Sequence, residues 1–419
     1  MAQTYFDNDQ QLEAMMASTK ALMLLDQIRN KQSYIDDLLP IITGIKEFNR
    51  LENNTGGVWG VSIHDDGIIV TSDSEGNIKI WDSSGKLLSE ELSAHDLGII
   101  NVKFSPNGKF IISTSKDNSL KLWEFKDKKL NYIRTFAGHQ EDVFDVKFSH
   151  NGDYIASSSD DGTIRLWKTD STNNKPEIIH NAQKCLTDEE QKITLLKGYD
   201  TDSLDFNPLD ESVIVYGDLL GRIVSFNTKN NNCSTIEIVG KHNRGIGAVR
   251  FSKNGDFFVS ADYEGVIKIW SKQGQSWKLI GEIPDQGNQI YTLEISPNSK
   301  LIAAAGLDGT VKLWNIKEIT QYYSNNQENL RPKPKILKKH FQYVQRIAFN
   351  KDGSILASAS NDGTVKIWKL QSPDLEAKPK ELLRYTCEFS GDYLKTSTNL
   401  PSWFVQESNI CIKEFNLSE

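Results

Sequence analysis

Three stretches of the sequence each contain a histidine, serines, an aspartate and a tryptophan at nearly constant spacing. In one of them, His139 is followed by Ser157 or Ser159, by Asp161 and by Trp167. A histidine held between a serine and an aspartate is the arrangement that makes the serine of many hydrolases a nucleophile. Taken alone, each stretch would therefore predict a hydrolase. The other two stretches contain His95, Ser113 or Ser115, Asp117 and Trp123, and His340, Ser358 or Ser360, Asp362 and Trp368.

The recurrence of this group favours a structural role over a catalytic one. A catalyst needs one such group beside an oxyanion site, whereas repeated copies indicate buried hydrogen-bond chains that join strands. A further copy keeps His242 and Trp270 but has Glu264 where the aspartate is expected. The next copy has Gln286 in place of the histidine, a change that a scaffold tolerates and a catalyst does not. We interpret nine residues as structural, namely His95, Asp117, Trp123, His139, Asp161, Trp167, His340, Asp362 and Trp368.

Residues 138–167 indicate how these side chains are held in place. Asn-Gly and Asp-Gly dipeptides, which are typical of tight turns, separate short segments that are typical of strands. A single three-stranded meander cannot bury both of its faces, so it must pack against copies of itself. The predicted strands are residues 142–148, 154–159 and 163–167.

Copies of this unit run through most of the chain. The closing aromatic residue recurs at intervals of 42, 44, 59, 44, 44 and 54 residues, so the unit is about 44 residues long. The two longer intervals contain polar connecting sequence, where insertions are tolerated. Seven copies can be counted, and they close at Trp81, Trp123, Trp167, Phe226, Trp270, Trp314 and Trp368.

The unit resembles the WD repeat. A Gly-His pair, an alternating strand, the pattern FS-x-NG and the pattern S-x-D-x-T-hydrophobic-x-hydrophobic-W follow one another in residues 138–167. The copy that closes at Phe226 departs from this pattern, because it has lost its histidine, aspartate and tryptophan. Seven copies imply an all-β fold, a seven-bladed WD40 β-propeller over residues 45–370, with the first blade closing at Trp81 and the last at Trp368.

Closure of the ring needs one strand from an end of the chain. Seven blades need seven outer strands, but only six connecting segments lie between the copies. In WD-repeat proteins the N-terminal strand commonly completes the last blade and removes the open sheet edges. We therefore expect residues 46–52 to be that strand, with residues 381–388 as the alternative. We also expect the outer strand of the third blade at 176–180 or 193–196, and a surface loop at 319–339 that ends in an outer strand.

Both ends of the chain differ from the repeats. Residues 1–44 have apolar residues at helical spacing and predict an N-terminal helical arm, and residues 371–419 predict a C-terminal extension that is partly helical. The segments LEAMMASTKALMLL, GIKEFNRLENNTGGVWGVSI and ELLRYTCEFSGDYLKTSTNL are similar to parts of the WD-repeat arrays of bacterial STAND-class signal-transduction NTPases. This resemblance implies a free-standing sensor or scaffold, a split-off subunit or a relic, because no NTPase sequence is present.

Composition argues against several classes of partner and activity. The net charge is −8 without long basic runs, so we expect neither nucleic acid nor a membrane as partner. The four cysteines lack spacing typical of pairing or metal binding, and no signal peptide is recognisable, so we expect a cytoplasmic location. Phosphate-loop, zinc-protease and nucleophile-elbow motifs are absent, so we predict no enzyme activity, cofactor or metal. We expect the isolated His64, His150 and His180 on the surface.

We expect the function to lie on a surface of the propeller. In WD-repeat proteins that bind peptides, contacts often come from the fifth residue after the Gly-His histidine and from the residue before the tetrad aspartate, both on the narrow face. Several of these positions are apolar here, and exposed apolar patches mark protein sites. Alternatively, these side chains fill the channel mouth against each other. The predicted partner-binding residues are Trp59, Ile100, Phe144, Leu219, Tyr263, Tyr291 and Leu307.

These observations predict a non-catalytic propeller that binds a protein or peptide. The resemblance to signalling proteins implies a sensor or regulatory module in bacterial-type signal transduction, with a separate STAND-type NTPase as one candidate partner. The first alternative is an assembly scaffold that recruits several proteins through different surfaces. The remote alternative is a hydrolase built on the propeller.

Overall fold

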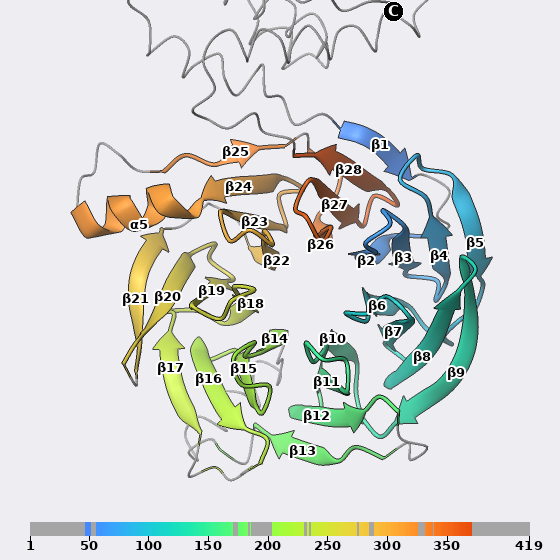
Figure 1. Cartoon of the computed structure of the whole chain (residues 1–419), viewed down its shortest axis with the longest axis horizontal. Helices are drawn as coiled ribbons and strands as arrows, with labels where there is room; N and C mark the ends of the chain where they lie inside the picture. Colours follow the sequence, from blue (N-terminus) through green and yellow to red (C-terminus); the bar gives the residue numbers. More distant parts are fainter. Residues whose placement is uncertain are drawn as a thin grey trace, which may run out of the picture. The chain divides into compact units, whose positions relative to one another are not determined.

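A ring of seven four-stranded antiparallel sheets surrounds a central channel (Figure 1). The first strand of each repeat is innermost, so the expected seven-bladed all-β propeller is confirmed. The predicted helical arm (1–44) and C-terminal extension (371–419) lie outside the residues that the structure describes. This computed structural model describes residues 47–51, 56–170, 175–182, 185, 203–229, 233, 236–274, 276–284, 289–325, 332–337 and 339–370.

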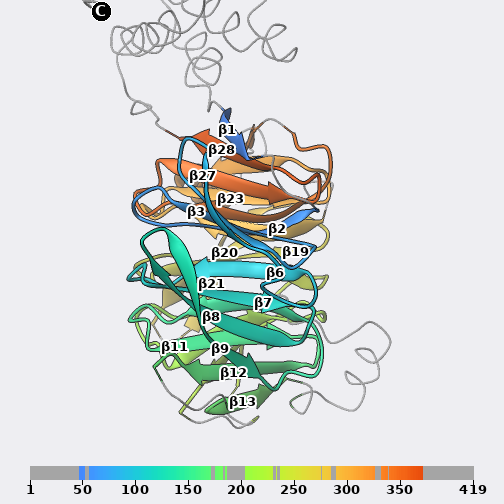
Figure 2. The ribbon, with the colours of Figure 1, turned by 90° about the vertical axis from the view of Figure 1, so that its right-hand side faces the viewer.

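Each blade follows the order of its strands in the sequence, from the channel outward. The side view in Figure 2 shows the strands of successive blades stacked around the ring. The strands are, in blade 1, β2 (Val58–Ile63), β3 (Ile69–Asp73), β4 (Ile78–Trp81) and β5 (Leu87–Glu91); in blade 2, β6 (Ile99–Phe104), β7 (Phe110–Ser115), β8 (Ser119–Lys126) and β9 (Lys129–Ala137); in blade 3, β10 (Val143–Phe148), β11 (Tyr154–Ser159), β12 (Thr163–Lys168) and β13 (Ile178–Asn181); in blade 4, β14 (Ser203–Phe206), β15 (Val213–Gly217), β16 (Arg222–Asn227) and β17 (Glu237–Lys241); in blade 5, β18 (Ile246–Phe251), β19 (Phe257–Asp262), β20 (Ile267–Gln273) and β21 (Ser276–Ile283); in blade 6, β22 (Ile290–Ile295), β23 (Leu301–Gly306), β24 (Val311–Asn315) and β25 (Lys335–Ile336); and in blade 7, β26 (Val344–Phe349), β27 (Ile355–Ser360), β28 (Val365–Lys369) and β1 (Glu47–Leu51).

Blade 7 is completed by the N-terminal strand, as expected. β1 pairs with β28 in antiparallel register, with Leu51 opposite Val365. Leu51 is 1% exposed and belongs to a buried cluster that also contains Val58 and Trp81 of blade 1. The same strand therefore closes the sheet of blade 7 and contributes to the core between blades 7 and 1.

The core is divided among the contacts between neighbouring blades. One buried cluster combines residues of blades 1 and 2, and another combines residues of blades 2 and 3. A blade is apolar on both faces, so every blade needs a neighbour on each side. Stability of the fold thus depends on an unbroken ring.

Two connecting segments, before blade 4 and before blade 7, can be compared with the expectations from the sequence. The outer strand of blade 3 is β13, which matches the first of the two expected positions. The expected loop at 319–339 is wrong in its first part, because Ile316–Asn325 forms helix α5. Ile316 and Ile319 are buried against blade 5 at helical spacing, and the Asn315 side chain caps the helix by accepting a hydrogen bond from the Lys317 amide. The segment does end in an outer strand, β25, as expected.

A disulfide joins blades 3 and 4. It links Cys185, which follows β13, to Cys233, which lies between β16 and β17. The expectation that the cysteines lack pairing is therefore wrong for these two residues: a pairing across two long connections leaves no recognisable spacing in the sequence. Since disulfides are rare in reducing compartments, cysteine usage no longer supports a cytoplasmic location.

Among the described residues, no helix combines the length and the apolar character that crossing a membrane requires.

Truncation of Leu51 tests the closure of the ring. We expect Leu51→Ala to lower the free energy of unfolding by about 2–5 kcal/mol, because it leaves a cavity between blades 7 and 1. Urea denaturation followed by tryptophan fluorescence measures this change. Leu92→Ala is the control: Leu92 is 59% exposed, and its truncation should cost within about 0.5 kcal/mol. Equal effects of the two substitutions would contradict closure by β1.

Candidate functional site

The two faces of the ring are defined by the inner strands. Each inner strand begins on one face, which also carries the turn between the second and third strands of the blade; we call it the start face. Each inner strand ends on the opposite face, which carries the turn between the first and second strands of the blade. We call this face the end face. All seven predicted partner-binding residues lie on the start face, at the second position of an inner strand or in a turn that follows a second strand.

A β-bulge marks the second residue of six inner strands. In each of these strands the pairing register shifts across that residue, so that it has no partner on the second strand. Bulges re-aim side chains and are common beside functional sites. The equivalent residue in blade 4, Asp202, lies outside the described residues. The bulged residues are Trp59, Ile100, Phe144, Gly247, Tyr291 and Gln345.

The predicted residues differ in how much surface they offer. Ile100 is only 8% exposed, so it contributes little to a binding surface. Leu307 is 47% exposed and is the most accessible of the seven. The remaining five, Trp59, Phe144, Leu219, Tyr263 and Tyr291, are partly exposed.

Trp59 is held in place by residues of two neighbouring blades. Its indole Nε1 donates a hydrogen bond of 3.0 Å to Oδ1 of Asn361 in blade 7. The ammonium group of Lys116 in blade 2 lies 5.1 Å from the ring centroid, within the range of a cation–π contact. The indole also covers Gly98, where an added Cβ would come within 2.5 Å of the ring. Only glycine permits this approach, so the ring is fixed on three sides.

The contacts continue from Trp59 through blade 7 to blade 6. Asn361 donates a hydrogen bond of 2.7 Å to the Gln342 side chain, and Gln342 follows Phe341 in the loop before β26. That loop is joined to the turn of Leu307, because the His340 amide donates to the Gly309 carbonyl. The Tyr291 and Tyr343 rings meet edge to face, with centroids 6.0 Å apart. We name this set of side chains the aromatic arc: Trp59, Tyr291, Leu307, Phe341 and Tyr343.

Sequence reasoning missed Phe341 and Tyr343. Phe341 is 88% exposed, a large value for a phenylalanine, and Tyr343 is partly exposed beside Tyr291. Both lie in the loop between the tetrad histidine and the inner strand, which was not among the positions carried over from the family. Aromatic residues in this otherwise polar loop are the signal that could have found them.

Leu219 and Tyr263 lie farther round the ring, near two glycines. A Cβ on Gly245 would meet both residues, and one on Gly247 would meet the Tyr263 ring. These side chains therefore pack over the buried glycine backbone at the start of blade 5. Outside them, the exposed side chains of Arg244 and Glu264 form an ion pair.

Four blades contain the complete chain of histidine, serine, aspartate and tryptophan. In blade 3, His139 Nδ1 lies 2.9 Å from Asp161 Oδ2 and His139 Nε2 lies 2.8 Å from Ser157 Oγ. The Trp167 indole donates a hydrogen bond of 2.9 Å to the same serine oxygen. A neutral imidazole with its proton on Nδ1 satisfies every group in this chain. The other complete chains are His95–Ser113–Asp117–Trp123, His242–Ser260–Asp262–Trp270 and His340–Ser358–Asp362–Trp368.

These chains position the loops of the start face. Asp362 Oδ2 also accepts a hydrogen bond of 2.9 Å from the Phe341 amide, and Asp161 Oδ2 accepts one of 3.0 Å from the Gln140 amide. Each aspartate thus holds the residue that follows the histidine. In blade 7 that residue is the exposed aromatic side chain of the aromatic arc, so a buried network fixes an exposed site.

The same geometry argues against nucleophilic catalysis. Ser157 has no exposed surface, and its oxygen already accepts a hydrogen bond from Trp167. A substrate carbonyl could reach this oxygen only if the blade opened. The serines of the other three complete chains are equally buried.

Blade 5 corrects one expectation. Glu264 does not replace the aspartate; Asp262, two residues earlier, lies 3.0 Å from His242 Nδ1. Asp262 ends the second strand, and from there its side chain reaches the histidine and accepts hydrogen bonds from the amides of its own turn. Fixed spacing from the tryptophan could not reveal this shift. Asp73 in blade 1 and Asp218 in blade 4 occupy the same earlier position and bind their own turns.

Blade 4 lacks the chain of histidine, serine, aspartate and tryptophan, and His180 contributes to a different buried network there. His180 is 2% exposed, so the expectation that it lies on the surface is wrong. The imidazole stacks on Phe226 at 4.1 Å between centroids, and Nε2 lies 3.2 Å from the Tyr216 hydroxyl. Because His180 belongs to β13, it connects blade 3 to blade 4. The histidine could not be assigned from sequence because it precedes the repeat that it serves.

Blade 6 lacks the serine. Ala304 stands at the position ten residues before Trp314, where the complete blades have a serine. As a result, the buried Nε1 of Trp314 has no hydrogen-bond partner among the described residues. Gln286, expected at the histidine position, lies outside them. An unpaired buried N–H destabilises the blade.

Charged side chains fill the channel between the two faces. Arg250 of blade 5 lies 3.3 Å from Asp145 of blade 3 and 3.1 Å from Glu294 of blade 6, and Lys103 and Lys147 approach Glu294 to 3.9 and 3.8 Å. Burial would raise the pKa of Glu294, but these cations lower it to about 2. Burial, opposed by Glu294, lowers the pKa of Lys103 to about 8. The network ties blades on different sides of the channel to one another.

Family comparison matches six of the seven blades. The sequence model of the family described as "WD domain, G-beta repeat" matches residues 46–82, 85–124, 130–168, 233–271, 277–315 and 332–369. The unmatched part between 169 and 232 contains the first three strands of blade 4, the blade without a tryptophan.

Curated relatives are similar over part of their length. Protein hir1 of Schizosaccharomyces pombe is 26% identical over 39% of this chain and 17% of its own length. Eukaryotic translation initiation factor 3 subunit I of Aspergillus oryzae is 27% identical over 36% of this chain and 42% of its own. The transcriptional corepressor LEUNIG_HOMOLOG of Arabidopsis thaliana is 22% identical over 73% of this chain and 34% of its own. The chain thus matches less than half of each relative.

Tryptophan-to-phenylalanine substitutions test how much the hydrogen-bond chain contributes to the free energy of unfolding. Trp167→Phe and Trp314→Phe both lose part of an indole from a buried site, but within the described part of the chain only the Trp167 indole has a hydrogen-bond partner to lose. We therefore expect Trp167→Phe to cost about 1 kcal/mol more than Trp314→Phe in urea denaturation. Ala304→Ser should supply the missing partner and raise the cost of Trp314→Phe toward that of Trp167→Phe. Equal costs in the wild-type background would contradict the assignment.

The buried histidines predict acid sensitivity. Burial, opposed by the paired aspartate, lowers the pKa of His139 below its ordinary value, and the same holds for His95 and His242. As pH falls through about 6.5, the unfolded chain binds protons that the folded chain does not, so stability falls. We expect a lower thermal midpoint at pH 5.5 than at pH 7.5, and a smaller difference in His139→Gln. An unchanged pH dependence in this variant would contradict the neutral state of His139.

Proposed function

The chain belongs to the WD-repeat family, and from that premise we propose that it is a non-catalytic module that binds a protein or peptide on its start face. The observation that carries this proposal is the aromatic arc. Trp59 and Tyr291 are held by side-chain contacts and the Phe341 backbone is held by Asp362, while Phe341 and Leu307 are 88% and 47% exposed. Rigid, exposed apolar side chains of this kind mark protein-binding sites.

Polar groups along the aromatic arc favour an extended peptide as the binding element. The amides of Asn361 and Gln342 lie between Trp59 and Phe341, where they can exchange their mutual hydrogen bond for bonds to a peptide backbone. Lys116 and Asp142, which are 4.0 Å apart beside Trp59, supply one charge of each sign. The proposed ligand is a segment with an apolar anchor residue between Trp59 and Phe341.

The proposal extends to the role of the protein, one candidate partner and its compartment. We infer a sensor or regulatory role, which fits the name of one relative, a transcriptional corepressor. A separate STAND-type NTPase remains one candidate partner; most of the sequence that suggests it lies outside the described residues, and the relatives reported above are eukaryotic proteins. The cytoplasm remains the proposed compartment, although it no longer has support from the cysteines.

An assembly scaffold is the second candidate, and the rim of the ring supports it. Large apolar side chains are exposed on the outer strands of three blades, β9, β17 and β25. Several surfaces could therefore recruit different proteins. These residues are Tyr132 (56% exposed), Ile133 (42%), Ile238 (55%) and Ile336 (55%).

Paired variants distinguish the two candidates. Phe341→Ala with Leu307→Ala removes exposed apolar surface from the start face, and Tyr132→Ala with Ile133→Ala removes a similar amount from the rim. We expect the start-face variant to lose its partner, since truncation of a hot-spot residue costs about 2 kcal/mol, or about 30-fold in affinity. Affinity purification from native cells with quantitative mass spectrometry measures the loss.

Circular dichroism and the thermal midpoint must first show that both variants are folded. Retention of the partner by the rim variant supports the start-face site. If only the rim variant loses partners, the start-face site is wrong and the scaffold is favoured. A captured NTPase that is lost with Phe341 and Leu307 would support the split-sensor interpretation.

A further inference from the structure

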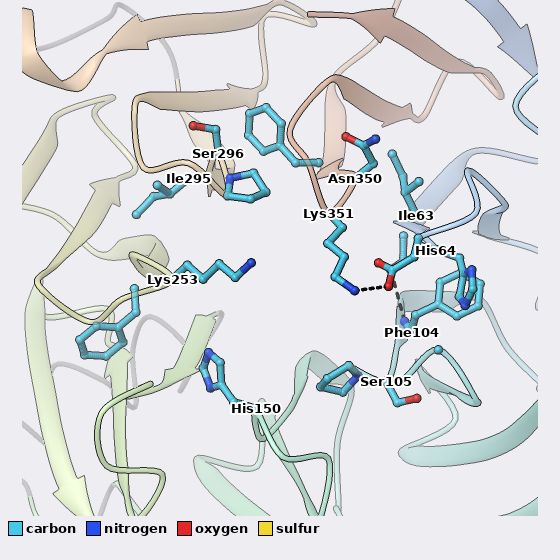
Figure 3. A pocket seen from close by; sticks show the side chains of 17 residues that line it. Ile63, His64, Phe104, Ser105, His150, Lys253, Ile295, Ser296, Asn350 and Lys351 are labelled. Atoms are coloured by element: carbon cyan, nitrogen blue, oxygen red, sulfur yellow. Dashed lines mark hydrogen bonds and ion pairs between the residues drawn. The ribbon is translucent and has the colours of Figure 1, made fainter.

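A second candidate site lies at the opposite end of the channel. A cavity of about 390 Å³ opens on the end face, among the turns between the first and second strands of six blades (Figure 3). This volume falls in the range of small-molecule sites. No residue of the aromatic arc lines it, so it is independent of the proposed protein-binding site.

Basic side chains from three blades converge on this cavity. Lys253, His150 and Lys351 belong to blades 5, 3 and 7, and in Figure 3 they extend toward the same space. Lys253 has no hydrogen-bond or ion-pair partner among the described residues. Lys351 pairs with Asp65 across the wall of the cavity. His150 lies at the rim, 4.0 Å from Glu211.

The channel network beneath the cavity reinforces its positive character. Lys103 and Lys147 immediately precede Phe104 and Phe148 at the ends of their inner strands. Both approach the Glu294 carboxylate, which also pairs with Arg250, and Arg250 pairs in addition with Asp145. The depressed pKa of Lys103 arises first from burial and then in part from the neighbouring cations. Four cations in this network, Lys103, Lys147, Arg250 and Arg346, thus face three carboxylates, Asp145, Asp205 and Glu294, an excess of one positive charge in a chain whose net charge is −8.

We propose that the end-face cavity binds the phosphate group of a small organic phosphate ester. Lysine ammonium groups bind phosphate as point charges, and Lys253 and Lys351 can approach it from different sides. Pro106 and Pro297 provide apolar wall for the organic part of the molecule. Among the described residues, no group of three or more histidine, cysteine, aspartate or glutamate side chains could hold a metal ion, which favours an anion over a cation as the ligand.

Substitutions of Lys253 and Asp65 should change the affinity for phosphate in opposite directions. Lys253→Gln removes the unpaired ammonium group, so we expect it to weaken binding at least about 10-fold. Asp65→Asn releases Lys351 from its carboxylate, so we expect it to strengthen binding several-fold. Lys300→Gln is the control, since Lys300 is exposed on the same face but does not line the cavity. It should leave binding unchanged.

Isothermal titration calorimetry with the full chain measures these effects. The probes are pyrophosphate, glucose 6-phosphate and, as the uncharged control, glucose. A sedimentation assay with phosphatidylcholine vesicles, with and without phosphatidylinositol phosphate, tests whether the phosphate belongs to a lipid headgroup. Binding in either assay that falls in Lys253→Gln and rises in Asp65→Asn supports the site, and the assay in which it occurs identifies the source.

Two results would overturn the proposal. One is absence of binding to pyrophosphate, glucose 6-phosphate and the phosphoinositide vesicles. The other is binding that Lys253→Gln and Lys300→Gln weaken equally, because general surface charge would then account for it. The variant Phe341→Ala with Leu307→Ala should bind the phosphate probes normally, so failure at one face is distinguishable from failure at the other.

Discussion

A blade of this protein has two apolar faces, and each must be covered by another blade. A linear array of such blades would leave one uncovered face at each end, so the chain must form a ring. The pairing of β1 with β28 meets this requirement, because it places the first strand in the last sheet. Leu51 then belongs to a core shared by blades 7 and 1. Complete burial of the faces of blades 7 and 1 depends on that closure.

Within the closed ring, each complete repeat buries its hydrogen-bond chain between strands and exposes loop residues on the start face. The chains of histidine, serine, aspartate and tryptophan lie between strands, where unpaired polar groups would be costly and nearly all are satisfied. The aspartates of these chains also accept hydrogen bonds from loop amides of the start face, so the backbone that carries Phe341 is held from below by a buried group. The channel charges separate this face from the basic cavity on the other side. The two candidate sites can therefore act independently.

The repeat could be predicted because its spacing is set by geometry: strand lengths and tight turns repeat, and so do Trp123 and Trp167. The start-face positions of Trp59 and Tyr291 came from the resemblance to WD-repeat proteins, carried over position by position. Asp262 and His180 could not be predicted, because each acts from a position outside the regular spacing. The aromatic pairing of Tyr343 and the end-face cavity depend on how separate blades meet. A pattern within one repeat does not contain that information.

The position of β1 also has a consequence for synthesis on the ribosome. The first strand of the ring leaves the ribosome early, but its partner β28 is the last strand of the ring to follow. Until then, the apolar edge of blade 1 stays uncovered and Leu51 has no sheet to join. Blades can form in order by local pairing, but the final step requires contact between residues far apart in the chain, which is slow. A product truncated before β28 would therefore remain open, and its exposed edges would make it a target for chaperones and proteases.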